Sequence, residues 1–256
     1  IHAIINDMFS PSQAEAHLAL IRQHLLGPDG AHLFDRPLAY HGGLQTYFQR
    51  AESASYFGRE IGIMYVHAHL RYCEALAHVG DAEGFFHALC QANPIAIREI
   101  VPSAAIRQAN CYYSSSDPAF ADRYEAFESY GQVRQATVAL EGGWRVYSSG
   151  AGISVRLIMQ CLLGLRQEQA HIVVDPVIPA ALDGLAVTLE WAERRIEVVY
   201  RITSKGRGLQ AATLNGTPLD FIRDANPYRP GAARITMQDI TLHFTDGVNQ
   251  LELWLE

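Results

Sequence analysis

The sequence lacks the features that mark membrane and nucleic-acid-binding proteins. Its 256 residues contain no apolar run that approaches the roughly 18–20 residues needed to cross a bilayer. The N-terminus has neither the charged region nor the small-residue cleavage site of a secretory signal. No lysine- or arginine-rich run offsets the formal net charge of −7, which argues against nucleic acid as a partner. We therefore expect this segment neither to insert into a membrane nor to bind nucleic acid.

Closely spaced cysteine pairs are also absent. Four cysteines occur, each in or near an apolar stretch: Cys73, Cys90, Cys111 and Cys161. Without a C-x-x-C pair, they indicate reduced, buried thiols in a cytoplasmic protein. The two histidines His67 and His69 would point roughly 200° apart on a helix, so they cannot chelate one metal ion without other ligands. We expect no metal site and no organic cofactor.

What the sequence does contain is enough apolar material for a large core. Hydrophobic residues make up 49% of the chain and charged residues 18%, which fits one large or two modest domains. The first residue is Ile1 rather than methionine, and it already lies inside the apolar pattern "IHAIINDMF". We expect the chain to be the tail of something longer.

Apolar residues recur at helical spacing up to about Ala170. In "SPSQAEAHLALIRQHLLG", Ser10 is placed to cap a helix, Pro11 to occupy its first position and Gln13 to complete a capping box, with Gly27 as the stop. The segments "DAEGFFHALCQANP" and "ISVRLIMQCLLGLR" repeat the pattern. The first should end before its proline, and the second at its last glycine or soon after.

After Ala170 the apolar period becomes two. The segments "LAVTLEW", "RRIEVVYRI", "ARITMQDITLHF" and "QLELWLE" all alternate, and turns are predicted at Asn215-Gly216 and Asp246-Gly247. Helices followed by strands indicate an α+β protein with a helical part, residues 1–169, and a separate antiparallel β-sandwich, residues 170–256.

The segment "REIGIMYVHAHLRYCEAL", residues 59–76, reads as a buried helix that is apolar on both faces. It nevertheless carries Glu60 and His67, which converge at one helix end whether Glu60 lies in the helix or in the loop that enters it. Carboxylates bind sugar hydroxyls and nearby aromatic faces cover sugar rings, so this end is a candidate sugar site. The structural alternative is a core histidine that satisfies buried groups.

Two further segments carry candidate chemistry. In "GGWRVYSSGAGISVRLIMQCLLGLR", Ser148, Ser149 and Gly150 stand at the start of a long apolar helix, where hydroxyls and backbone amides could face one anion. No lysine follows the glycines, so this is not a Walker loop, and simple helix capping is the alternative. The segment "YYSSSDPAFADRY" reads as a loop with a turn at Asp117-Pro118, or as the rim of a saccharide pocket.

Taken in order, three segments resemble the inverting glycoside phosphorylases of the cellobiose phosphorylase family. They are "EIGIMYVHAH" (residues 60–69), "SSGAG…LLGLR" (residues 148–166) and "VDPVIP" (residues 174–179). That family has "ENGGVYTHAN", "TGTAS…ILGIR" and "IDPCIP" in the same order. The segments "FGREIGIMYVHAHLRY" and "NCYYSSSD" look more like the β-1,2-glucan branch of this family. That branch includes 1,2-β-oligoglucan phosphorylase and the phosphorylase-like region of cyclic β-1,2-glucan synthase.

The resemblance implies a fold and a role for particular residues. The fold is the C-terminal part of an (α/α)6 barrel, residues 1–169, followed by the β-sandwich. The family's substrate-binding residues fall on Glu60 and Tyr65, and its phosphate-binding histidine falls on His67. The hydroxyl-glycine contact with phosphate falls on Ser148 to Gly150, where a shift by one residue lets either Ser148 or Ser149 take the role.

The implied reaction converts phosphate and a β-1,2-glucan to α-glucose 1-phosphate and a shortened glucan. Phosphate is a substrate here, not a cofactor. In this family the general acid is an aspartate from an earlier barrel segment. We therefore expect this chain alone to be inactive and to need the remainder of the barrel, in the same or another chain. If the whole is a glucan synthase, the location becomes the cytoplasmic side of a membrane.

Two other functions remain open from the sequence. An inverting hydrolase on the same fold would need a base carboxylate about 6.5–9.5 Å from the acid. The carboxylates that could supply one are Asp35, Glu52, Glu60 and Asp117. A non-catalytic carbohydrate-binding module is the other possibility, and it would place sugar binding in the strands beyond Ala170.

Overall fold

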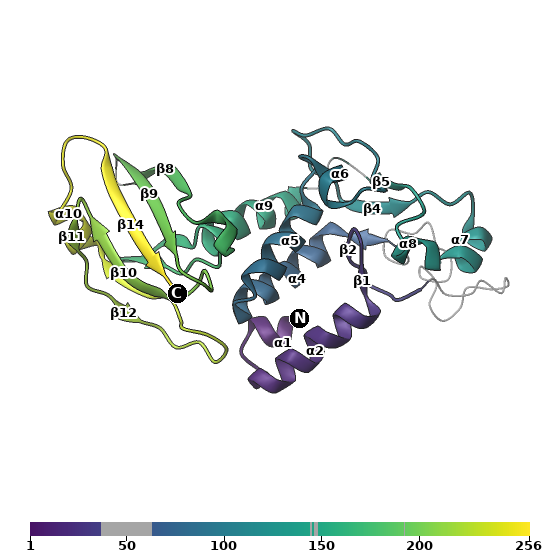
Figure 1. The fold of residues 1–256 in the computed structure, drawn as a ribbon, viewed down its shortest axis with the longest axis horizontal. Coiled ribbons are helices and arrows are strands. Elements are labelled where there is room, and N and C mark those ends of the chain that lie inside the picture. The colour runs from purple at the N-terminus through teal and green to yellow at the C-terminus, as the bar shows by residue number, and fades with distance from the viewer. Residues whose placement is uncertain (37–62, 144, 146–147, 192) are drawn as a thin grey trace. The chain divides into compact units, whose positions relative to one another are not determined.

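A computed structural model describes residues 1–36, 63–143, 145, 148–191 and 193–256 (Figure 1). The chain divides into two compact units. The first comprises Ile1–Ala3, Phe9–Cys73 and His87–Ser154, and the second comprises Ile4–Met8, Glu74–Phe86 and Val155–Glu256. The expected boundary between residues 169 and 170 therefore stays a prediction, and each unit is described by itself.

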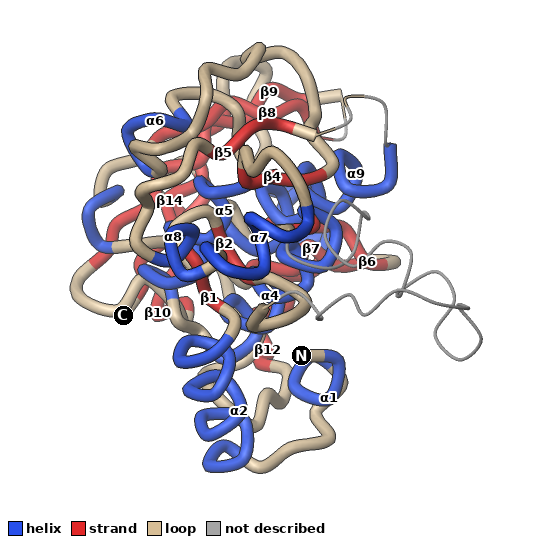
Figure 2. Tube along the Cα trace, turned by 90° about the vertical axis from the view of Figure 1, so that its right-hand side faces the viewer, coloured by secondary structure: helices blue, strands red, loops and turns tan. Residues whose placement is uncertain are grey.

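The first unit begins with the helix that the capping signal predicts. After the short helix α1 (His2–Ile5), α2 spans Pro11–His24. The Ser10 hydroxyl accepts a hydrogen bond from the Gln13 amide, and the Gln13 side chain accepts one from the Ser10 amide, which confirms the capping box. The helix ends before Gly27 because it runs directly into the hairpin of β1 (Leu26–Gly27) and β2 (Gly30–Ala31) (Figure 2).

The next helix is preceded by the first strand of a three-stranded antiparallel sheet. Its order is β3 (Met64–Tyr65), β4 (Ser115–Pro118), β5 (Leu140–Gly142), and α4 (Val66–Val79) follows β3 at once. The prediction of one continuous helix is wrong at Met64 and Tyr65, whose backbones pair with Ser116 and Ser115. The predicted loop at Asp117-Pro118 is also wrong, because β4 is paired on both sides.

The remaining helices of the first half are short, apart from two. They are α5 (Ala82–Ala92), α6 (Ile97–Ile100), α7 (Arg123–Ser129), α8 (Gly131–Arg134) and α9 (Ser148–Leu157). The last continues as a π-helix, Ile158–Leu162, and the chain turns at Gly164 with φ +64°. The predicted ends of α5 before Pro94 and of this helix at Gly164 are confirmed. Helix α4 is buried on both faces, as predicted.

The second unit contains two sheets. One has the order β12 (Ile222–Arg223), β13 (Ala233–Thr236), β7 (His171–Val174), β6 (Leu165–Glu168). The other has the order β11 (Thr217–Pro218), β10 (Leu209–Leu214), β14 (Asn249–Leu255), β9 (Arg194–Ile202), β8 (Ala186–Trp191). All pairs are antiparallel except β9 with β14, which is parallel.

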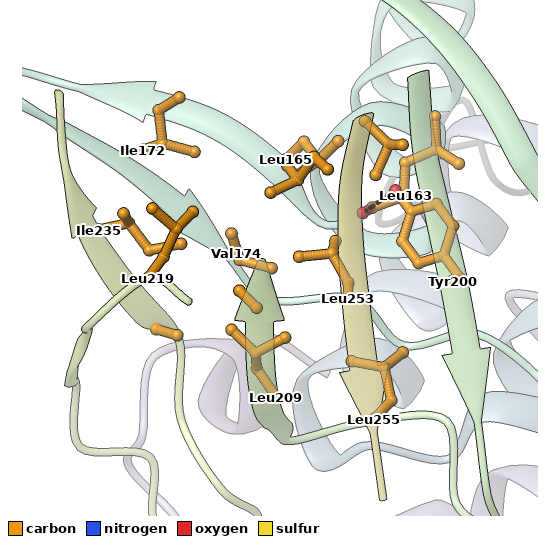
Figure 3. Close-up of a cluster of buried hydrophobic side chains, with 14 of the residues drawn as sticks. Leu163, Leu165, Ile172, Val174, Tyr200, Leu209, Leu219, Ile235, Leu253 and Leu255 are labelled. Atoms are coloured by element: carbon orange, nitrogen blue, oxygen red, sulfur yellow. Dashed lines mark hydrogen bonds between the residues drawn. The ribbon is translucent and has the colours of Figure 1, made fainter. Parts of the chain in front are cut away.

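The two sheets share one hydrophobic core. Side chains from β6, β7 and β13 point toward those of β10 and β14, as Figure 3 shows for Leu165, Val174, Leu209 and Leu253. The buried Tyr200 of β9 donates its hydroxyl proton to the Leu163 carbonyl at 2.7 Å, so its polar end is satisfied. The alternating segments thus form two sheets that face each other, and the α+β class is confirmed.

Three details of the strand prediction have different outcomes. The turn at Asn215-Gly216 is confirmed, since both residues have positive φ and join β10 to β11. The strand predicted over "ARITMQDITLHF" is wrong after Thr236, because Met237–Leu242 forms α10 (Met237–Leu242). The Thr236 hydroxyl caps that helix by accepting from the Asp239 amide at 3.1 Å. The turn at Asp246-Gly247 therefore follows a helix, and it does not join two strands.

All four cysteines are free thiols, but the prediction that they are buried is wrong for three of them. Only Cys73 is buried, whereas Cys90, Cys111 and Cys161 are partly exposed. Among the helices that the structure describes, none combines the length and the apolar character needed to cross a membrane.

Candidate functional site

The candidate site is built on the junction between β3 and α4. Tyr65 pairs with Ser115 of β4, and the Val66 amide donates to the Ser114 carbonyl at 2.9 Å. The helix starts directly after the strand, so His67 lies in its first turn. Amides in a first turn have no intrahelical acceptor and form the positive end of the helix dipole. An anion near His67 would therefore meet a favourable field.

Tyr65 and His67 lie side by side at this junction. Their ring centroids are 6.0 Å apart and the ring planes differ by only 9°. Both side chains are half-buried, so each keeps some exposed surface. Tyr65 offers an aromatic face and a hydroxyl of the kind that sugar sites use, and His67 offers a nitrogen that can donate to an anion.

Tyr112 brings the start of α9 into this neighbourhood. A Cβ atom built on Gly150 would lie 1.7 Å from the Tyr112 hydroxyl oxygen and 2.3 Å from its ring carbon Cζ. Only glycine leaves room for this contact at the first turn of α9. At Gly152, two residues later, a Cβ atom would meet nothing within 4 Å. The glycine requirement is therefore specific to position 150.

Tyr112 is also a neighbour of Tyr65. Burial raises the pKa of the Tyr112 hydroxyl to about 12, and the Tyr65 phenol acts in the same direction. Tyr112 thus lies near Tyr65 and against the backbone of Gly150. Sequence reasoning singled out the segment that contains Tyr112 but not this residue. The signal in the sequence was the pair of tyrosines before a run of three serines.

The structure describes the other predicted site residues only in part. Ser148 and Ser149 form the start of α9, but the positions of their side chains are not described. Glu60 lies outside the described residues, as does Glu52. The roles of all the predicted site residues stay predictions.

Strand β4 adds buried polar side chains next to the junction. Ser116 is fully buried and accepts a hydrogen bond from the buried Arg107 guanidinium at 3.1 Å. Arg107 also lies over the Tyr113 ring, 5.6 Å from its centroid, and burial lowers the pKa of Arg107. Burial raises the pKa of Asp117, although its hydrogen bond with Ser115 and the charge of Arg107 oppose that shift.

A buried ionic network next to β4 was missed from the sequence. Asp29 hydrogen-bonds to His32 at 2.8 Å, and the other ring nitrogen of His32 hydrogen-bonds to the Tyr130 hydroxyl at 2.9 Å. Burial alone would raise the pKa of Asp29, but the charge and hydrogen bond of His32, together with a hydrogen bond from Ser116, leave it below the usual value. Asp29 lies in a Pro-Asp-Gly turn, which by itself indicates only a tight turn.

His69 proves to be the core histidine of the pair. Its Nδ1 accepts from the Ala31 amide at 2.9 Å, which leaves Nε2 to donate to the Ala88 carbonyl at 2.7 Å. Burial lowers the pKa of His69 to about 4, so the ring is neutral at physiological pH. Within the described ranges, no cluster of three or more histidine, cysteine or acidic residues could hold a metal ion.

Comparison with known proteins gives one informative match. No family model matches the chain. Over 239 residues, or 93% of its length, the chain is 41% identical to a 1,2-beta-oligoglucan phosphorylase from Listeria innocua serovar 6a. The predicted resemblance to the β-1,2-glucan branch of the glycoside phosphorylases is thereby confirmed. The chain spans only 22% of that relative's own length.

Proposed function

We propose that this chain is the C-terminal, phosphate-binding part of an inverting phosphorylase that acts on β-1,2-linked glucan oligosaccharides. The observation that carries the proposal is the 41% identity to a 1,2-beta-oligoglucan phosphorylase along 93% of the chain. The Tyr65–His67 ring pair and the Tyr112–Gly150 contact support it, because they supply both sugar-binding and anion-binding groups.

In this proposal two first turns hold the phosphate. His67, in the first turn of α4, donates a hydrogen bond to a phosphate oxygen, and charge-assisted hydrogen bonds of this kind are the stronger ones. The backbone amides of Ser148 to Gly150, in the first turn of α9, are further donors, with a hydroxyl from Ser148 or Ser149. Glu60 and Tyr65 bind the sugar whose anomeric carbon reacts.

The chemistry then follows from the position of the phosphate. A phosphate oxygen attacks the anomeric carbon from the face opposite the leaving glucan, so the glycosidic C–O bond breaks as the new C–O bond forms. A carboxylic acid gives its proton to the leaving oxygen. Phosphate takes the place of the activated water of an inverting hydrolase, and no catalytic base is needed. The product is α-glucose 1-phosphate, and the reaction uses no metal or organic cofactor.

The proposal assigns the general acid to a part of the catalytic domain that this chain does not supply. That acid is an aspartate in the remainder of an (α/α)6 barrel, to which residues 1–169 contribute their helices. Residues 170–256 form the accompanying β-sandwich. We place the complete enzyme in the cytoplasm, with glucan oligosaccharide and phosphate as its small-molecule partners.

The test is the phosphate dependence of cleavage. The complete protein that carries this chain is incubated with β-1,2-linked glucooligosaccharides, with and without phosphate, and the products are followed by ¹H and ³¹P NMR. We expect α-glucose 1-phosphate only when phosphate is present. Free glucose formed at the same rate without phosphate would identify a hydrolase, and binding without any cleavage would identify a carbohydrate-binding module.

A further inference from the structure

The Tyr112 side chain ends at the start of α9. It packs against the backbone of Gly150, where even a methyl group would overlap it. Ser148, Ser149 and Gly150 are the first three residues of a ten-residue helix, so their amides have no acceptor in the preceding turn. The hydroxyl therefore stands next to the first turn of α9, whose free amides are hydrogen-bond donors.

The chemical state of this hydroxyl suits a donor. Its pKa, which burial raises to about 12, lies far above neutral pH, so the hydroxyl keeps its proton and carries no charge that would repel an anion. Among the described residues, no group is hydrogen-bonded to it. The next residue behaves differently, since the buried Tyr113 hydroxyl accepts a hydrogen bond from the Gln108 amide at 2.7 Å. Of two adjacent tyrosines, one hydroxyl is thus used by the fold and the other is left for a ligand.

We propose that the Tyr112 hydroxyl donates a hydrogen bond to the bound phosphate, beside the amides at the start of α9. This inference rests on the proposed function and adds a residue to its phosphate site. A set dominated by donors fits a phosphate, which is rich in acceptor oxygens, better than a sugar hydroxyl, which also needs an acceptor.

The test is Tyr112→Phe in the complete protein. Phenylalanine keeps the ring that packs on Gly150 and removes only the hydroxyl. We expect the KM for phosphate to rise about ten- to hundredfold, as for other lost hydrogen bonds to charged groups, while the KM for the glucan changes less than about twofold. In the reverse direction the KM for α-glucose 1-phosphate should rise by a similar factor, with the KM for the acceptor glucan unchanged.

Tyr113→Phe is the matched control. It removes a neighbouring hydroxyl that only satisfies the Gln108 amide, so it should lower the unfolding temperature and leave the KM for phosphate unchanged. A raised glucan KM with an unchanged phosphate KM in Tyr112→Phe would assign the hydroxyl to the sugar and overturn the inference. Unchanged values for both substrates would overturn it as well. Either result leaves the proposed function standing if the unmodified protein still requires phosphate.

Discussion

Two histidines on one helix, two residues apart, have different environments. The helical geometry predicts that His67 and His69 point in different directions, and the structure agrees, with His69 fully buried and His67 half-buried. The sequence could not decide which one is buried. The partners of His69, the Ala31 amide and the Ala88 carbonyl, come from segments whose pairing no local pattern reveals.

The pKa of His69 makes stability depend on pH. In the unfolded chain the ring has an ordinary pKa of 6.5, and in the folded protein about 4, so the unfolded state binds the proton first as pH falls. Stability should be complete above pH 6.5 and fall by about 3 kcal/mol between pH 6.5 and 4. Urea denaturation at several pH values measures this loss.

His69→Gln is the control for that titration. Glutamine can accept from one backbone group and donate to the other, but it does not titrate. The variant should be less stable than the unmodified protein at pH 7, and the difference should shrink as pH falls to 4. Parallel stability curves for the two proteins across this range would show that His69 does not carry the effect.

Gly150 and Gly152 offer a second test at the residue scale. Alanine is the better helix former by about 1 kcal/mol at an interior position, so both substitutions help the helix in principle. At position 150, however, the methyl group overlaps Tyr112, whereas at position 152 it meets open space. We expect Gly150→Ala to lower kcat/KM for phosphorolysis at least about tenfold, and Gly152→Ala to leave it near the original value. Steady-state kinetics of both variants measures these values. Equal losses of kcat/KM would contradict the contact between Tyr112 and Gly150.

At the scale of elements, local signals were predictable and long-range pairing was not. The capping box at Ser10 and Gln13 involves residues three apart, and the helix formed as expected. The alternation after Thr236 also suits a strand, but the threonine cap and the Asp239 amide favour a helix there. Tyr65 looked helical because the apolar spacing continues through it. It lies in a strand instead, because its backbone pairs with Ser115, fifty residues away.

Helix α4 is held at its last turn by an ion pair from the β-rich part of the chain. The Arg229 guanidinium makes two hydrogen bonds to Asp175, at 2.5 and 3.0 Å, and its Nε donates to the carbonyls of Ala77 and His78. These carbonyls belong to the last turn of the helix, where a positive charge is favoured. Asp175 belongs to the "VDPVIP" segment, so this motif supports the helix whose first turn carries His67.

Breaking that pair should cost much more stability than breaking an exposed one. The Arg229 side chain is only 4% exposed, so Asp175→Asn would leave a buried cation without its counter-ion, at a cost of about 3–5 kcal/mol. Asp246→Asn is the comparison, because its pair with Arg194 is exposed and should be worth less than about 1 kcal/mol. Thermal and urea unfolding of the two variants measure both values. Equal, small losses of stability would mean that the Arg229–Asp175 pair does not hold helix α4 in place.

At the scale of the whole molecule, the order of three short segments was the most informative signal in the sequence. It predicted the similarity to a phosphorylase that the comparison confirms, even though the chain spans only 22% of that relative. The buried network of Asp29, His32 and Tyr130 left no comparable trace, because its members lie up to 101 positions apart and only folding brings them together. The (α/α)6 barrel also stays a proposal.

The central claim is that residues of this chain hold the phosphate, and the phosphate KM of a His67→Asn variant of the complete protein tests it most directly. Asparagine keeps a hydrogen-bonding group but removes the imidazole. The account predicts that the KM for phosphate rises about ten- to hundredfold, while the KM for the β-1,2-glucooligosaccharide stays within about twofold of the original. A phosphate KM that does not change, in a variant that folds normally, would contradict the account.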